Sequence, residues 1–124
     1  IAADDSLNYN IIKKVNKNVG IAQGNKFISI LNKNTNYGVE SDFFGIKINN
    51  LTDTNFKINF YEGDASIIEN CEYIGQVEFD TVDVSSSKIF LTLSKDMDDG
   101  RIIYKLYDDQ KTILEEKHIE NKKG

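Results

Sequence analysis

The chain has 124 residues, enough for one domain with a single core, and 40% of them are hydrophobic. Its net charge of −5 and its scattered lysines argue against a nucleic-acid partner, because phosphate binding relies on clustered Lys and Arg. No window approaches the ~18 apolar residues of a membrane span, so we expect no membrane partner. Cys71 is the one cysteine, which excludes an internal disulfide and fits a reducing, cytoplasmic location.

Residues 1–17 are expected to form an N-terminal lead-in without regular structure. Ile11 and Ile12 make an apolar pair within a polar frame, and Lys13 follows them. Because the first residue is Ile1 and not Met, we expect the chain to be part of a longer protein.

Apolar and polar residues alternate with a period of two in short runs along the rest of the chain, which indicates strands. Gly, Asn, Asp and Ser separate the runs, since the chain has no proline. The expected strands are Val19–Gln23, Phe27–Leu31, Phe43–Ile48, Asn55–Tyr61, Ile74–Phe79, Ile89–Leu93 and Ile102–Leu106. Thr112–Ile119 is either a last strand or the start of a helix. We therefore predict an all-β antiparallel β-sandwich of about eight strands over residues 18–120, with a charged tail at 121–124.

No catalytic constellation is present in the sequence. Nucleophilic catalysis needs a nucleophile, a base and an orienting group, and no pattern joins His118 to Cys71, the one His and the one Cys. Asp96–Gly100 lacks the ligand spacing and terminal Glu of a calcium loop, which favours a turn. Asn50-Leu51-Thr52 matches a glycosylation acceptor, but such triplets arise by chance in an Asn-rich chain. We expect this chain to be neither an enzyme nor a metal protein.

Several short motifs follow one another in a specific order along the predicted strands. They are Val19-Gly20-Ile21, Lys33-Asn34-Thr35, Tyr61-Glu62-Gly63-Asp64, Ile74-Gly75-Gln76-Val77 and Asp99-Gly100-Arg101-Ile102-Ile103-Tyr104. This order resembles the β part of the substrate-binding domain of the Hsp70 (DnaK-like) chaperone family, over roughly residues 9 to 109. The resemblance implies a β-sandwich that holds an extended peptide, with main-chain hydrogen bonds and one deep apolar pocket.

Position by position, the resemblance implies a peptide-binding site made of Val19, Ile21, Ile46, Phe56 and Ile58, with Asn49 where a small residue completes an arch over the peptide. Phe56 stands where the family has a small aliphatic residue, so we expect its ring to make the pocket shallow or closed. Alternation alone cannot separate such a pocket from ordinary core positions.

The resemblance also implies what the parent protein would contain. An upstream domain would bind ATP and Mg²⁺ and control peptide affinity through a linker at Ile11-Ile12, with a J-domain co-chaperone and a nucleotide-exchange factor as partners. Lys13 replaces the acidic residue of the family's linker, which puts ordinary coupling in doubt. No cofactor is expected in this chain itself, and its open groove offers a route to self-association. The alternatives are an adhesion or carbohydrate-binding module of an exported protein and a purely structural domain.

Overall fold

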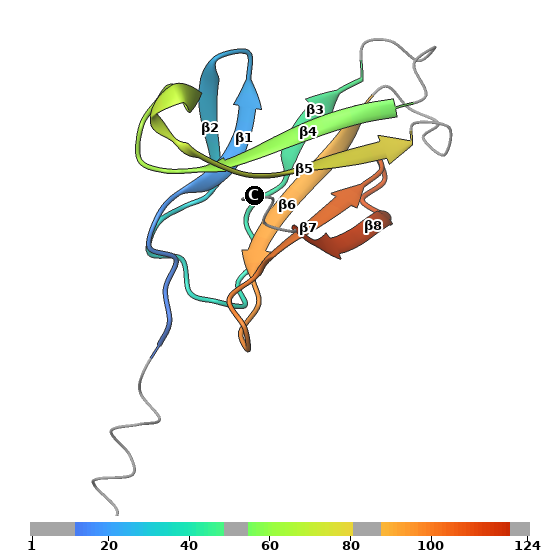
Figure 1. Ribbon diagram of the computed structural model, residues 1–124. Helices are drawn as coiled ribbons and strands as arrows, with labels where there is room; N and C mark the ends of the chain where they lie inside the picture. The colour runs from blue at the N-terminus through green and yellow to red at the C-terminus, as the bar shows by residue number, and fades with distance from the viewer. Residues whose placement is uncertain (1–11, 49–54, 81–87, 120–124) are drawn as a thin grey trace, which may run out of the picture.

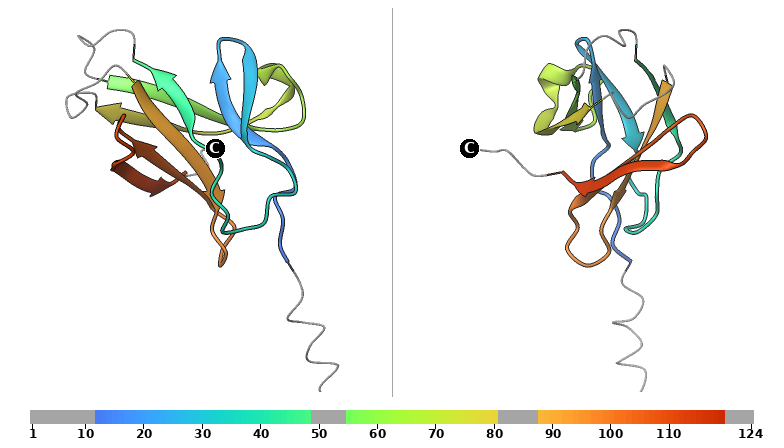
Figure 2. Two further views of the ribbon diagram at one scale, coloured as in Figure 1. Left: turned by 180° about the vertical axis from the view of Figure 1, so that it is seen from behind. Right: turned by 90° about the vertical axis from the view of Figure 1, so that its right-hand side faces the viewer.

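The protein is a sandwich of two antiparallel β-sheets (Figures 1 and 2). The computed structural model describes residues 12–48, 55–80 and 88–119. Within these residues the strands are β1 (Val19–Gln23), β2 (Lys26–Leu31), β3 (Phe44–Lys47), β4 (Asn55–Glu62), β5 (Glu72–Asp80), β6 (Lys88–Lys95), β7 (Ile102–Tyr107) and β8 (Ile113–His118). One sheet has the order β2-β1-β4-β5 and the other β3-β6-β7-β8. The predicted all-β antiparallel sandwich is confirmed.

Two segments that the sequence left open have a definite structure. The run at Thr112–Ile119 contains strand β8, and the connection between β4 and β5 contains a short 3-10 turn, η1 (Ile68–Asn70). In the part of the chain that the structure describes, no helix is long and apolar enough to cross a membrane.

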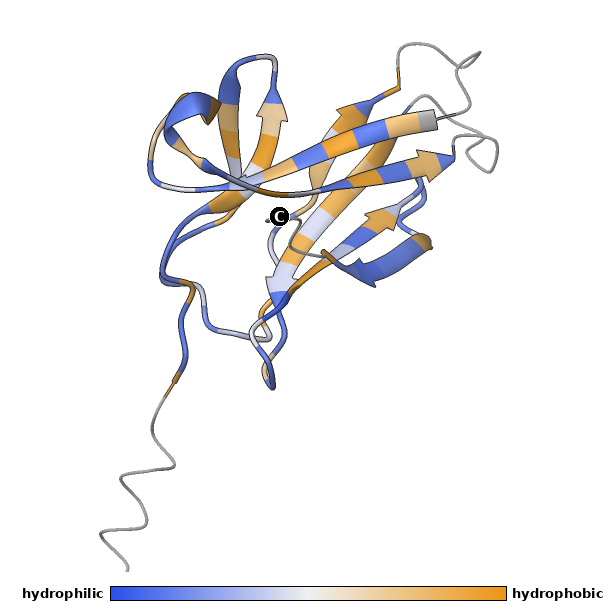
Figure 3. Cartoon of the chain, in the orientation of Figure 1, coloured by the Kyte–Doolittle hydropathy of each residue, from blue (hydrophilic) through white to orange (hydrophobic). Residues whose placement is uncertain are grey.

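The core lies between the two sheets, because every second side chain of each central strand points inward. The hydropathy colours alternate along β4 and β5 for this reason (Figure 3). Ile58 and Phe60 of β4 belong to the same buried cluster as Leu91 and Leu93 of β6. Burial of each such side chain stabilises the fold by roughly 1.5–3 kcal/mol relative to its exposure.

The β1–β2 hairpin depends on a glycine at its base. The register between the two strands shifts between Val19 and Gly20, and a Cβ atom at Gly20 would lie 1.8 Å from the carbonyl oxygen of Ile28. Only glycine allows this close approach of two backbones. On its outer side, the hairpin is held by the β4–β5 connection, because the amide of Phe27 donates to the carbonyl of Ser66 at 3.0 Å.

Part of the predicted lead-in is packed onto the sandwich. The amide of Val15 donates to the carbonyl of Thr35 at 2.8 Å, and the Val15 side chain, 1% exposed, belongs to the core. Ile12, in contrast, is 62% exposed, and Ile11 lies outside the described residues. The ordered domain therefore includes residues on the N-terminal side of position 18.

Candidate functional site

β1 separates from β4 halfway along its length. β1 pairs with β2 as far as Gln23, but its pairing with β4 ends at Ile21, which lies opposite Phe60. β4 nevertheless continues alongside β5 to Asn55, which lies opposite Asp80. In Figure 1 the β1–β2 hairpin accordingly turns away from β4. This divergence opens the sheet at one end of the sandwich.

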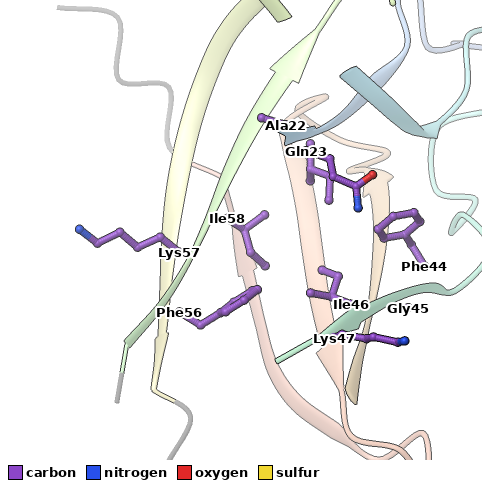
Figure 4. Close-up of a pocket in the computed structure, with 10 residues that line it drawn as sticks. Ala22, Gln23, Phe44, Gly45, Ile46, Lys47, Phe56, Lys57 and Ile58 are labelled. Carbon is purple, nitrogen blue, oxygen red and sulfur yellow. The ribbon is translucent and has the colours of Figure 1, made fainter. Parts of the chain in front are cut away.

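A pocket of about 500 Å³ lies where the strands diverge (Figure 4). It is lined by Ile21–Gln23 of β1, Phe44–Lys47 of β3 and Phe56–Ile58 of β4. Figure 4 shows the Phe56 and Ile58 side chains directed from β4 toward Ile46 of β3, whereas Lys57 projects away from the pocket. Most of the lining residues are apolar and come from both sheets, while polar atoms make up slightly more than half of the exposed lining surface.

Four of the residues predicted for the peptide-binding site line this pocket: Ile21, Ile46, Phe56 and Ile58. Val19 does not. It lies opposite Glu62, where β1 and β4 are still paired, and its side chain is completely buried in the core. The sixth residue, Asn49, lies outside the described residues.

Phe56 forms a wall of the pocket. Its place on β4, opposite Phe79 of β5, directs the ring inward, and the ring packs partly buried against the core. The pocket nevertheless keeps about 500 Å³ beside the ring. The ring therefore forms one wall of the pocket without filling it.

The resemblance missed several lining residues, of which Phe44 and Gln23 are the most informative. Phe44 alternates with Ile46, so the period of two already placed both on one face of β3. Gln23 shares the parity of Ile21 on β1, but a polar residue at the end of a strand does not indicate a pocket, and the divergence of β1 from β4 brings it to the pocket's edge. Pairing between strands far apart in sequence determines that divergence.

Three possible metal-ligating side chains, those of Asp96, Asp99 and His118, come within 4.8 Å of one another. Both carboxylates already have partners. Asp96 Oδ1 accepts the amide N–H of Asp98 at 2.7 Å, and Asp99 Oδ2 accepts from Arg101 Nε at 2.8 Å. The Asp98 amide and, second, His118 at 3.4 Å lower the pKa of Asp96. Turn hydrogen bonds and ion pairs thus account for this cluster.

A second group of side chains gathers around Phe90 on the outer face of β6. Phe43, 48% exposed, meets Phe90 edge-on at 6.0 Å and Tyr107 edge-on at 4.9 Å between ring centroids. Lys111 Nζ lies 3.7 Å from the centroid of Phe90 and 5.3 Å from that of Phe43. A lysine ammonium therefore covers the aromatic face that a sugar ring would stack on.

No protein-family model matches this chain, and no curated protein sequence matches it either. A function has to be argued from the site, because one fold serves many functions. The pocket at the divergence of β1 from β4 is the site that brings together most of the predicted residues.

Proposed function

We propose that this chain is the peptide-binding module of an Hsp70-like molecular chaperone and holds extended apolar segments of unfolded proteins. The observation that carries the proposal is the divergence of β1 from β4 directly beside a pocket of about 500 Å³, most of whose lining residues are apolar. A gap between two strands suits an extended peptide, and a pocket beside it suits one apolar side chain of that peptide.

Backbone geometry supports an extended ligand. The residues of β1 beyond Ile21 have β2 on one side and no β4 partner on the other. β3 is the outermost strand of its sheet, so among the described strands one of its edges has no hydrogen-bonded neighbour in that sheet. An extended peptide satisfies such edges by strand addition, in which main-chain hydrogen bonds supply affinity and side-chain pockets supply specificity.

The pocket supports an apolar anchor. Ile21 and Ile58 are buried, and Ile46 and Phe56 are partly buried around the cavity. Burying a Leu-sized side chain among them would contribute roughly 1.5–3 kcal/mol. A peptide with one large aliphatic residue in an otherwise extended backbone is therefore the ligand that fits best.

The role of the parent protein follows from the same proposal. An upstream domain would bind ATP and Mg²⁺ and control peptide affinity, together with a J-domain co-chaperone and a nucleotide-exchange factor. The exposure of Ile12 supports a linker role. Its side chain is 62% exposed on this domain, so its apolar surface is free to contact a neighbouring domain.

The test is fluorescence anisotropy of a labelled, Leu-centred, otherwise polar extended peptide titrated with the purified domain. Ile46→Trp should abolish saturable binding, because an indole would occupy the pocket from the β3 side. Gln76→Trp is the matched control: Gln76 is exposed on β5, its amide donates to Asn59 at 2.8 Å, and it does not line the pocket. Equal binding by all three proteins, or binding by none of them while each remains folded by circular dichroism, would overturn the proposal.

A further inference from the structure

We propose that Glu40 is a positioning residue of the peptide site. Its carboxylate fastens the segment that precedes β3 to the outer face of β6 and β7, and this attachment sets the place of the pocket wall that β3 provides. We call this segment, residues 38–43, the strap. The inference rests on the proposed function, since it concerns the geometry of that same site.

β3 depends on such an attachment because it is short and lies at the edge of its sheet. It has four residues, and among the described strands β6 is its one hydrogen-bonded neighbour. Phe44 and Ile46 of β3 both line the pocket. The strap runs directly into Phe44, so the position of the strap decides where this wall of the pocket begins.

Backbone groups hold the strap along β6 beyond the end of the β3–β6 pairing. The amide of Gly38 donates to the carbonyl of Lys95 at 2.7 Å, and the amide of Ser41 donates to the carbonyl of Leu93 at 2.9 Å. The Leu93 amide donates in return to Ser41 Oγ at 3.0 Å. The serine hydroxyl thus takes the place of a backbone carbonyl, and the strap follows β6 without being a strand.

Glu40 adds two side-chain hydrogen bonds to this attachment. Thr92 follows the inward-facing Leu91 on β6, so its side chain points to the outer face of the sheet, yet Thr92 is 1% exposed. Its hydroxyl donates to Glu40 Oε2. The hydroxyl of Tyr107 on β7, also buried, donates to the same oxygen at 2.5 Å. Buried hydroxyls are rarely without a partner, so one carboxylate of the strap serves two strands of the sheet.

The charge of Glu40 strengthens these bonds. Burial disfavours its ionised form, but the hydrogen bonds from Thr92 and Tyr107 and the charge of Lys105 outweigh burial and lower the pKa of Glu40. The ionised carboxylate accepts from both hydroxyls, and hydrogen bonds to an ionised group are the stronger kind. Lys105 Nζ is 4.0 Å from Glu40 Oε1 on a partly exposed side chain, so this ion pair adds little. The two hydroxyl bonds are therefore the main side-chain attachment of the strap.

β7 offers a matched control for the loss of one of these bonds. The Tyr104 hydroxyl donates to Glu115 at 2.5 Å, which is the same pairing of a tyrosine hydroxyl with a carboxylate. Glu115 belongs to β8, and neither Tyr104 nor Glu115 lines the pocket. Tyr104→Phe and Tyr107→Phe thus remove the same group from the same strand, and only Tyr107→Phe acts on the strap.

The experiment titrates each folded protein into a labelled Leu-centred peptide and follows the anisotropy. We expect Tyr107→Phe to weaken binding about threefold and the double variant Thr92→Val/Tyr107→Phe about tenfold, because a net hydrogen bond shifts an equilibrium by roughly this much. Tyr104→Phe should bind as the original protein does. Tyr107→Phe keeps the ring that meets Phe43 edge-on, so the loss would come from the hydroxyl.

Two variants of Glu40 itself separate the hydrogen bonds from the charge. Glu40→Gln keeps a carbonyl oxygen with two lone pairs, which can accept from both hydroxyls, so this variant should retain most of the affinity. Glu40→Ala removes the acceptor and should bind at least as weakly as the double variant. If Glu40→Ala does not fold by circular dichroism, the double variant decides, because Val and Phe match the shapes of the side chains they replace.

The outcomes separate this inference from the function it rests on. Equal affinities of the double variant and the original protein overturn the positioning role and leave the peptide-binding function standing. An equal loss in Tyr104→Phe and Tyr107→Phe also overturns it, because the effect would then come from general loosening of the fold. So does a Glu40→Gln variant as weak as Glu40→Ala. Binding by none of the proteins, the original included, overturns both.

Discussion

Phe60 of β4 stacks on Tyr104 of β7, with ring centroids 6.0 Å apart and planes inclined by 30°. The two strands belong to different sheets, so this pair joins the layers of the sandwich at its centre. Both rings are buried, and Tyr104 satisfies its hydroxyl by donating to Glu115 at 2.5 Å. Aromatic pairs of this kind add to the stabilisation that comes from buried area alone.

Replacing Phe60 by Ala should therefore lower the free energy of unfolding by about 3–5 kcal/mol, the range for loss of a fully buried aromatic ring. Urea unfolding followed by circular dichroism measures this loss. Phe43→Ala is a suitable comparison, because Phe43 is 48% exposed and its truncation should cost about 1 kcal/mol. Equal losses for the two variants would mean that the stack does not hold the sheets together.

The stability of the β1–β2 hairpin, which borders the pocket, should depend strongly on Gly20. Alanine there would place its Cβ 1.8 Å from the carbonyl oxygen of Ile28, so the two backbones must move apart. We expect Gly20→Ala to lower the free energy of unfolding by at least about 3 kcal/mol, because a backbone carbonyl cannot move aside by changing rotamer as a side chain can. Gly24→Ala, at a turn with φ of +63° and open space, should cost only about 1–2 kcal/mol. Thermal unfolding of both variants tests this order.

The architecture was predictable from the sequence because strands have a period of two. Phe56, Ile58 and Phe60 face inward as their alternation indicates, and Asp96–Gly100 forms the expected turn between β6 and β7. Both features depend on residues close together in the chain, where propensity and patterning act directly.

The pocket could be predicted only in part, because alternation shows which residues share a face of a strand but not which of them line a pocket. Val19 and Ile21 have the same parity on β1 and both belong to the buried core, yet Ile21 lines the pocket and Val19 does not. What separates them is the point at which β1 leaves β4.

The stability of the domain should respond to pH through Glu62 and Glu72, which lie opposite each other in the β4–β5 register. Burial, followed by the hydrogen bond with Glu72 and its charge, raises the pKa of Glu62 above its ordinary value. A folded state with a raised carboxyl pKa binds more protons than the unfolded state. The stability that Glu62 contributes in this way is therefore fully present below the unfolded pKa of about 4.3. It is lost as the pH rises through the folded pKa.

Glu72→Gln should therefore stabilise the domain at neutral pH, by roughly 0.2–1 kcal/mol for a cross-strand like-charge contact. The gain should shrink as the pH falls and Glu62, whose pKa is raised, becomes protonated, because the repulsion between the two carboxylates then disappears. Urea unfolding at a series of pH values measures it. Glu78→Gln, which alters an exposed carboxylate opposite Lys57, should give no gain at neutral pH. A pH-independent effect of Glu72→Gln would rule out the charge explanation.

The size of the peptide's anchor residue should be set by Phe56. Its ring lines the pocket and packs only partly buried against the core, so Phe56→Val would enlarge the pocket on the β4 side. We expect the variant to bind Leu-centred peptides more tightly and to gain most for a larger anchor such as Phe or Trp, by up to about tenfold, which corresponds to about 1.4 kcal/mol.

Paired anisotropy titrations of the original protein and Phe56→Val with Leu-, Phe- and Trp-centred peptides test this expectation. Val77→Ala is the matched control, because Val77 is buried on β5 opposite Ile58 and does not line the pocket. A variant that merely loosens the core would weaken all three peptides alike. If Phe56→Val instead left the ranking of the anchors unchanged, the ring at position 56 would not be a wall that the anchor touches, and the anchor would have to lie closer to β3.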